Sequence, residues 1–369
     1  MFLKKKVVTV TGSLSSIAWK KFRQNKLGFG SLVFIGFTVV VACLGYLVTP
    51  DQTPFANDQY LEVGLKKPGF SVLMLPVNDR YLHENQAFYK TMLWGTVKNR
   101  ENIPIRAFTV NNSSVWYIEY GALPGDPAMV KSLPLHLVRM PVKKTFWLGT
   151  DRFGRDYLSQ LMIGTRVSLS VGLISVLISL VIGIFMGAVG GYYRGWVDNL
   201  VVWIINVIWS IPTLLLVIAI TFALGKGFWQ VFIAVGLTMW VEVARVVRGQ
   251  ILGIREKEYV EAARALGFSD FRIIFHHILP NVMAAVIVIS AANFASAILM
   301  EAGLSFLGLG VQPPVPSWGS MIKENYGYIV LDYAYLAVLP GIAIMLMVLA
   351  FMLMGNALRD ALDVRMSDS

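Results

Sequence analysis

Cysteine and histidine are scarce in this sequence. Cys43 is the single cysteine of 369 residues, so no disulfide can form within the chain and a cysteine-based zinc cluster is excluded. The four histidines offer little scope for a metal site: His276 and His277 are adjacent and point to different sides of a helix, and His83 and His136 lie far away in the sequence. We therefore expect no metal and no cofactor.

A nucleotide-binding loop is also missing. Phosphate-cradling loops have the pattern Gly-x-x-x-x-Gly-Lys-Ser/Thr, whereas the only Gly-Lys pair, Gly225-Lys226, is followed by Gly227. The chain is therefore not expected to hydrolyse ATP alone, and we predict that it is not an enzyme.

Charged residues make up only 15% of the chain, against 56% hydrophobic residues and a mean hydropathy of +0.62. These values are typical of a polytopic membrane protein. The formal net charge of +10 comes largely from basic residues beside the apolar runs, as the positive-inside rule requires. The membrane explains this charge, so no nucleic-acid partner is predicted.

Six apolar runs are long enough to cross a hydrocarbon core of about 30 Å. The first follows residues 1–26, a basic segment without acidic residues, and we interpret this run as a retained anchor rather than a signal peptide. The short outer loops contain few basic residues, so both termini, including the tail 357–369, are predicted in the cytoplasm. The predicted spans are residues 27–48, 167–193, 199–224, 228–244, 281–300 and 336–356.

Residues 49–163 differ from the rest of the chain: they are rich in proline and carry charges of both signs. We predict an extracytoplasmic insertion domain here, before a permease core at 164–356. Residues 106–110 and 115–120 are predicted as two β-strands joined by a turn at 111–114. The domain is either a spacer on the outer face or a docking site for a binding protein.

A few polar residues lie inside the predicted spans. Asn206 and Ser210 lie close to Pro212 in span three, and Asn293 is the strongly polar residue of span five. These three are candidates for a translocation path, although helix packing uses the same residue types. Glu242 is predicted near the cytoplasmic end of span four, where an interfacial role is favoured over a proton relay.

The most polar stretch between two spans is residues 245–280, which must lie in water. It is predicted to form two short helices. In the first, residues 257–266, a stripe at helical spacing is expected to face a partner; it comprises Tyr259, Ala262, Ala263 and Leu266. Gly267 is predicted to end this helix in a left-handed conformation, and Ser269 to cap the second helix, residues 270–278.

This stretch resembles the EAA loop of membrane permease subunits of ATP-binding-cassette (ABC) importers. The resemblance rests on Glu261-Ala262-Ala263, on Gly267, and on Leu279-Pro280 at the start of the next span. Two further stretches resemble the C-type permease of dipeptide and oligopeptide importers: WLGTDRFGRD at 147–156 with GTRVSL at 164–169, and LSFLGLGVQPPVPSWG at 304–319.

The resemblance implies an all-α polytopic fold of six transmembrane helices, the type I ABC importer permease fold, with an extracytoplasmic insertion that contains β-structure. It implies half of a translocation pathway for peptides in the inner membrane of a bacterium. The implied partners are a second, homologous permease in a heterodimer, two cytoplasmic ATPase subunits and an extracytoplasmic solute-binding protein. Closure of the ATPase on ATP would drive alternating access. The residues that the ATPase would contact are Tyr259, Glu261, Ala262, Ala263, Leu266 and Gly267.

Three alternatives stay open at this point. An importer of the same family could carry nickel or another peptide-like solute. An ion-coupled secondary transporter would need ionisable residues in mid-membrane, and the predicted spans two, three, five and six have none. A purely structural membrane subunit would bind no ATPase.

Overall fold

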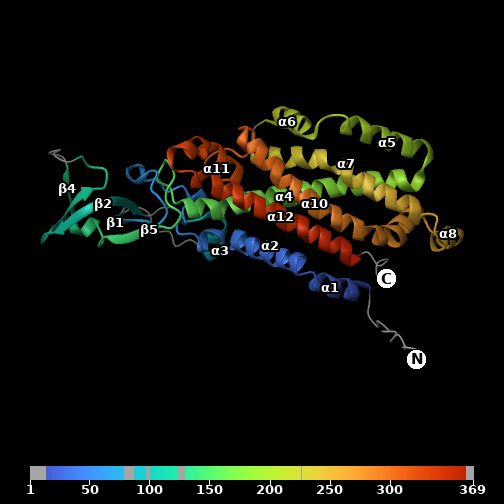
Figure 1. The fold of residues 1–369 in the computed structure, drawn as a ribbon, viewed down its shortest axis with the longest axis horizontal. Coiled ribbons are helices and arrows are strands. Elements are labelled where there is room, and N and C mark those ends of the chain that lie inside the picture. Colours follow the sequence, from blue (N-terminus) through green and yellow to red (C-terminus); the bar gives the residue numbers. More distant parts are fainter. Residues whose placement is uncertain (1–13, 79–86, 97–99, 124–128, 226, 363–369) are drawn as a thin grey trace, which may run out of the picture.

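Long helices run side by side along the longest axis of the molecule, and a β-sheet stands at one end of them (Figure 1). The structure is a computed structural model that describes residues 14–78, 87–96, 100–123, 129–225 and 227–362. Parts of the predicted terminal segments 1–26 and 357–369, as well as His83 and Lys226, lie outside the described residues.

Among the described residues, five helical segments are long and apolar enough to cross a membrane. A sixth crossing forms if α5 (Gly195–Trp209) and α6 (Thr213–Leu224) act as one broken span, since they meet at an angle of 89°. Pro212 lies at this break, as the sequence predicted, because proline lacks the N–H that a continuous helix needs. The five segments are built on α2 (Lys26–Leu44), α4 (Tyr157–Tyr193), α7 (Phe228–Ile254), α10 (Leu279–Phe306) and α12 (Tyr335–Leu362).

Helices α4, α7, α10 and α12 all extend beyond the predicted spans, and α4 and α7 do so by the most residues. The predicted second span begins at residue 167, but α4 begins at Tyr157 because the Asp156 carboxylate caps it by accepting from the Ser159 N–H at 2.7 Å. The predicted fourth span ends at residue 244, whereas α7 continues to Ile254. Glu242 therefore lies in the middle of α7.

Glycines on one side of α4 let α7 approach closely. A Cβ added at Gly183 would lie 2.5 Å from Cβ of Val243, and one at Gly187 would lie 2.6 Å from the carbonyl oxygen of Ala244. This four-residue spacing of small residues is typical of membrane helices whose backbones touch. The α4–α7 pair forms the centre of the bundle.

The second short helix predicted in the polar stretch is not separate. After α9 (Asp270–Arg272) the chain forms a π-helical turn, Ile273–Ile278, and runs without interruption into α10. Pro280 would clash with the carbonyl of His276 in a regular α-helix, and a wide turn just before it relieves this clash.

The insertion between α2 and α4 contains a five-stranded antiparallel sheet of order β4-β3-β2-β1-β5. The predicted hairpin is confirmed: Val110 pairs with Val115, and the Asn111 N–H donates to the Ser114 carbonyl at 2.9 Å. Two small apolar clusters, one around Val63 and Phe146 and one around Leu75 and Ile105, lie against the sheet. The strands are β1 (Phe70–Asn78), β2 (Arg100–Val110), β3 (Ser114–Glu119), β4 (Val130–Pro134) and β5 (Val142–Phe146).

A buried ion pair joins the insertion to the bundle. Arg155 Nε lies 2.6 Å from Asp151 Oδ2, and a second guanidinium nitrogen lies 3.0 Å from Glu324 Oε2. Glu324 belongs to α11 (Trp318–Asn325), whose Trp318 indole donates to the Leu161 carbonyl on α4 at 3.0 Å. The remaining short helices are α1 (Leu14–Gln24), α3 (Phe88–Trp94) and α8 (Glu258–Ala265).

Candidate coupling helix and translocation face

Helix α8 projects from the end of the bundle opposite the sheet (Figure 1). One side of it is anchored: Val260 is fully buried and Ala263 is 4% exposed, and both pack against residues of α7 and the π turn such as Ile251 and Ile273. This packing fixes the orientation of an eight-residue helix that would not be stable alone.

Gly267 ends α8 in the predicted left-handed conformation, with φ of +76°. The Gly267 N–H donates to the Arg264 carbonyl at 2.9 Å, and the Phe268 N–H donates to the Ala263 carbonyl at 3.2 Å. These two bonds make a Schellman cap. Ser269 caps α9 as predicted, its hydroxyl accepting from the Arg272 N–H at 3.4 Å.

Large apolar side chains are exposed on α8, among charged residues, and again past the cap. Tyr259 is 41% exposed and Leu266 is 74% exposed, and beyond the cap Phe271 is 67% and Phe275 is 50% exposed. The two phenylalanine rings lie 4.3 Å apart. We call these four residues the coupling patch. Glu261 and Ala262 are exposed beside it.

Ala263 does not belong to this outer face. The sequence analysis placed it on the exposed stripe, whereas the structure buries it with Val260, because the inner side of so short a helix needs a small residue to pack closely. Phe271 and Phe275 were missed for the opposite reason. Their four-residue spacing was visible in the sequence, but they were assigned to a separate helix rather than to a continuation of this face.

Polar contacts join the segments on either side of α8 to the end of α4. The Tyr192 hydroxyl at the end of α4 donates to Asp270 Oδ1 at 2.6 Å, and the Arg255 guanidinium donates to the Tyr192 carbonyl. Arg194 forms a hydrogen-bonded ion pair with Glu256, which lowers the pKa of the Glu256 carboxyl. These contacts join the end of α4 to the end of α7 and to α9, on either side of α8.

The three predicted path residues are not brought together. Asn206 and Ser210 are exposed on α5 and at its end, where the Ser210 hydroxyl donates to the Val207 carbonyl at 2.7 Å. Asn293 is fully buried, and within the described residues its side-chain amide has no hydrogen-bond partner. Its neighbours on the same side of α10, Val286 and Ala297, pack into the bundle. Asn293 therefore faces the interior of this chain, apart from Asn206 and Ser210.

A cavity of about 670 Å³ lies between α7, α10 and α12, toward the end that carries α8. Small residues line its wall on α10, among them Ala284 and Ala285. The polar residues that line it are Gln250, Asn281, Asn356 and Arg359. A polar surface on membrane-spanning helices cannot face lipid, so it requires water or another protein beside it.

Sequence reasoning placed Glu301 at the start of an outer loop, but α10 continues to Phe306 and Glu301 is fully buried. Its Oε1 accepts from the Ser305 hydroxyl at 2.6 Å. The Ser305 hydroxyl in turn lies 3.3 Å from that of Ser317, the residue that caps α11. This buried network holds α11 against the end of α10.

Comparison with known families identifies the chain. The family described as "Binding-protein-dependent transport system inner membrane component" matches residues 179–368, which is just over half of the chain. The chain belongs to this family. A second match, "N-terminal TM domain of oligopeptide transport permease C", covers residues 13–68. The sheet of the insertion lies outside both matched ranges.

Curated relatives agree with this assignment. The permease is 42% identical over 220 residues to the glutathione transport system permease protein GsiD of Pectobacterium atrosepticum, covering 60% of this chain and 73% of the relative. It is also 42% identical to the dipeptide transport system permease protein DppC of Alkalihalophilus pseudofirmus, covering 60% and 72%. A solved inward-facing structure of the MetNI methionine ABC transporter is more distant, with a TM-score of 0.46, 19% identity and coverage of 56% and 97%.

These matches confirm the family implied by the EAA-like stretch. The chain is a multi-pass permease subunit of an ABC importer, and its fold is helical with an inserted β-domain.

Proposed function

We propose that this permease forms half of a translocation pathway for dipeptides or oligopeptides, and that a separate ATPase drives it through α8. The observation that carries the proposal is the coupling patch: four large side chains are exposed on α8, at its cap, on α9 and on the π turn, and α8 itself packs against α7 and the π turn. An exposed apolar face on a short helix suits a groove on a partner protein.

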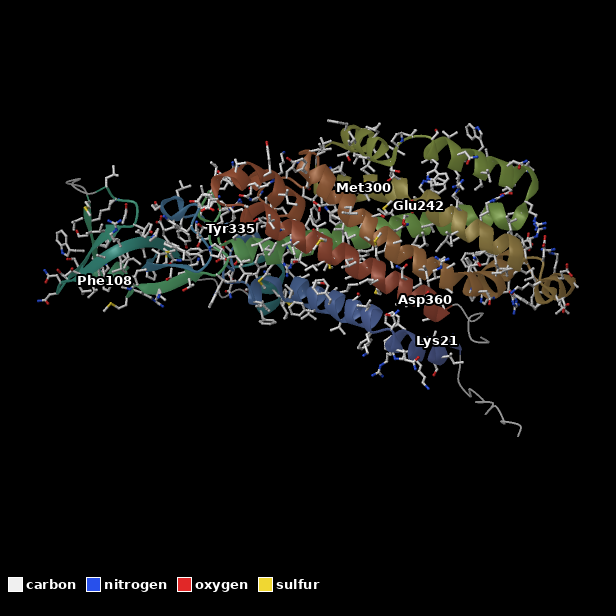
Figure 2. All side chains as sticks on the ribbon, viewed as in Figure 1. Lys21, Phe108, Glu242, Met300, Tyr335 and Asp360 are labelled. Carbon is white, nitrogen blue, oxygen red and sulfur yellow. The ribbon has the colours of Figure 1, made fainter. Side chains whose placement is uncertain are left out.

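Several observations support an orientation of the chain in the membrane with α8 on the cytoplasmic side. Helix α1 and the last turns of α12 lie near the end of the bundle that carries α8, and the sheet lies at the opposite end. Helix α1 contains the basic residues Lys20, Lys21 and Arg23. Figure 2 shows Lys21 and Asp360 toward the first end and Phe108 at the second. The positive-inside rule then places both termini and α8 in the cytoplasm, and the insertion domain outside. The chain lies in the inner membrane of a bacterium.

The substrate class comes from the relatives. The permeases named above carry glutathione and dipeptide in their names, and the N-terminal match is to an oligopeptide permease. Peptide import is therefore favoured over nickel. The expected partners are a homologous second permease, two ATPase subunits and an extracytoplasmic solute-binding protein. ATP hydrolysis belongs to the ATPase subunits.

The mechanism follows from the packing of α8. ATP-driven closure of the ATPase pair displaces α8, and the packing of Val260 and Ala263 against α7 and the π turn passes this displacement to the spans. Packed spans adopt discrete arrangements, so the displacement favours one state of the pathway over another. Moving an equilibrium from 1:99 to 99:1 requires about 5.5 kcal/mol of differential binding.

The proposal is tested by purifying the chain from its own membranes and identifying its partners by mass spectrometry. The wild-type chain should co-purify with a second permease and with ATPase subunits. The Glu261→Lys variant should co-purify with the second permease but not with the ATPase subunits. Glu101→Lys reverses a charge on the exposed surface of β2 and should lose neither. Absence of any ATPase from the wild-type preparation, with the second permease still bound, would refute the coupling role of α8.

A further inference from the structure

Glu242 is a carboxylate at the middle of α7, a helix long and apolar enough to cross a membrane. It is preceded on α7 by residues 228–241 and followed by residues 243–254, so each helix end is roughly 18 to 21 Å away. Its side chain is exposed on the surface of this chain, and Figure 2 shows it midway along the bundle, between the sheet and α8.

Glu242 has no ion-pair partner within the described part of the chain. The nearest basic residue on its own helix is Arg245, whose guanidinium lies 3.5 Å from the centre of the Trp209 ring. The next, Arg248, is bound at 2.5 and 2.7 Å to both carboxylate oxygens of Asp198. Both guanidinium groups are therefore directed elsewhere, and Glu242 remains available to a cation from outside the chain.

Glu242 lies on the same side of α7 as two residues that line the cavity. Val246 and Gln250 follow it at four-residue spacing on the same side of α7, and both line the 670 Å³ cavity between α7, α10 and α12. Lipid cannot cover this face, because a charged side chain at the centre of a bilayer costs about 2.5 to 3.5 kcal/mol even by the lowest scales. Glu242 lies one helical turn beyond Val246, the cavity-lining residue of α7 nearest to it, toward the sheet end of the bundle.

We propose that Glu242 binds the ammonium group of the substrate at the middle of the translocation path. This rests on the proposed function of peptide import. Peptides with a free N-terminus share one cation whatever their side chains, so a single carboxylate selects them as a class. The small residues of α10 across the cavity, such as Ala284 and Ala285, leave room for variable side chains. Glu242 would therefore determine specificity within the path, in addition to any selection by the binding protein.

The test uses the complete complex in proteoliposomes with its binding protein, and the probes are a labelled dipeptide and its N-acetyl derivative. Because the binding protein is the same for every variant, a change in the ratio of the two uptake rates reports on the permease. Glu242→Gln, which keeps size and polarity, should lower this ratio by about tenfold, the factor that corresponds to about 1.4 kcal/mol. Glu101→Gln, on the sheet, should leave it unchanged.

Three outcomes would overturn the inference. If Glu242→Gln leaves the ratio of dipeptide uptake to N-acetyl-dipeptide uptake unchanged, the carboxylate does not bind the ammonium group. Loss of the second permease from the purified variant shows that Glu242 is instead an interface ion-pair residue. If the wild-type complex transports neither probe, the peptide function itself fails, and this inference fails with it; the first two outcomes leave the peptide function intact.

Discussion

Replacing Gly267 by valine tests whether the shape of the α8 cap matters for coupling. Gly267 has φ of +76°, and a Cβ added there meets nothing within 4 Å, so the obstacle is the backbone conformation and not crowding. A β-branched residue held in this region costs about 1 to 3 kcal/mol. If the docked state needs this cap, its population falls about 5- to 150-fold.

The assay is ATP-dependent uptake in proteoliposomes, normalised to the amount of chain in the membrane. Gly267→Val should lose uptake and the stimulation of ATP hydrolysis by substrate, while the assembled bundle keeps its thermal stability. Gly267→Asn should retain more activity, because asparagine tolerates the left-handed region. Gly253→Val is the matched control, since Gly253 lies in helical backbone with open space around its Cα. Wild-type uptake by Gly267→Val would refute the reasoning.

Two further predictions concern the stability of the fold. Arg155→Met leaves the buried Asp151 carboxylate without its cation and should destabilise the outer part of the protein by about 3 to 5 kcal/mol, seen as a lower melting temperature in detergent. The exposed Arg152→Met should melt like wild type, and equal melting of the two variants would contradict the structural role of the pair. Gly187→Leu should lower the melting temperature through overpacking against α7, which typically costs about 1 to 3 kcal/mol, whereas Gly36→Leu, on the open side of α2, should not. Melting of Gly187→Leu at the wild-type temperature would show that the close α4–α7 contact is not required.

Local chemistry made several features predictable from the sequence. Gly267 and Ser269 identify their caps because a left-handed residue and a side-chain acceptor are needed at those positions. The turn at residues 111–114 and the break at Pro212 were predictable for the same kind of reason. The apolar runs marked the spans because their length must match the thickness of the hydrocarbon core.

Features that depend on tertiary contacts were not predictable. The end of α7 was placed at residue 244 because charges follow, but the structure gives those charges partners and the helix continues. Which side of α10 carries Asn293 depends on how α4 and α7 pack against it, and composition alone does not contain that information. The strand order β4-β3-β2-β1-β5 likewise depends on pairing between residues far apart in the chain.

The central claim is that an ATPase subunit contacts the coupling patch during transport. Cys43 is the only cysteine, so a Cys43→Ser, Leu266→Cys variant carries a single reactive thiol on α8, at a position that is 74% exposed. We would treat the assembled complex with a photoactivatable thiol reagent and identify the cross-linked partner by mass spectrometry. The account predicts a cross-link to an ATPase subunit whose yield changes when ATP is added. A complex that transports substrate but gives no cross-link from residue 266 to any ATPase would contradict it.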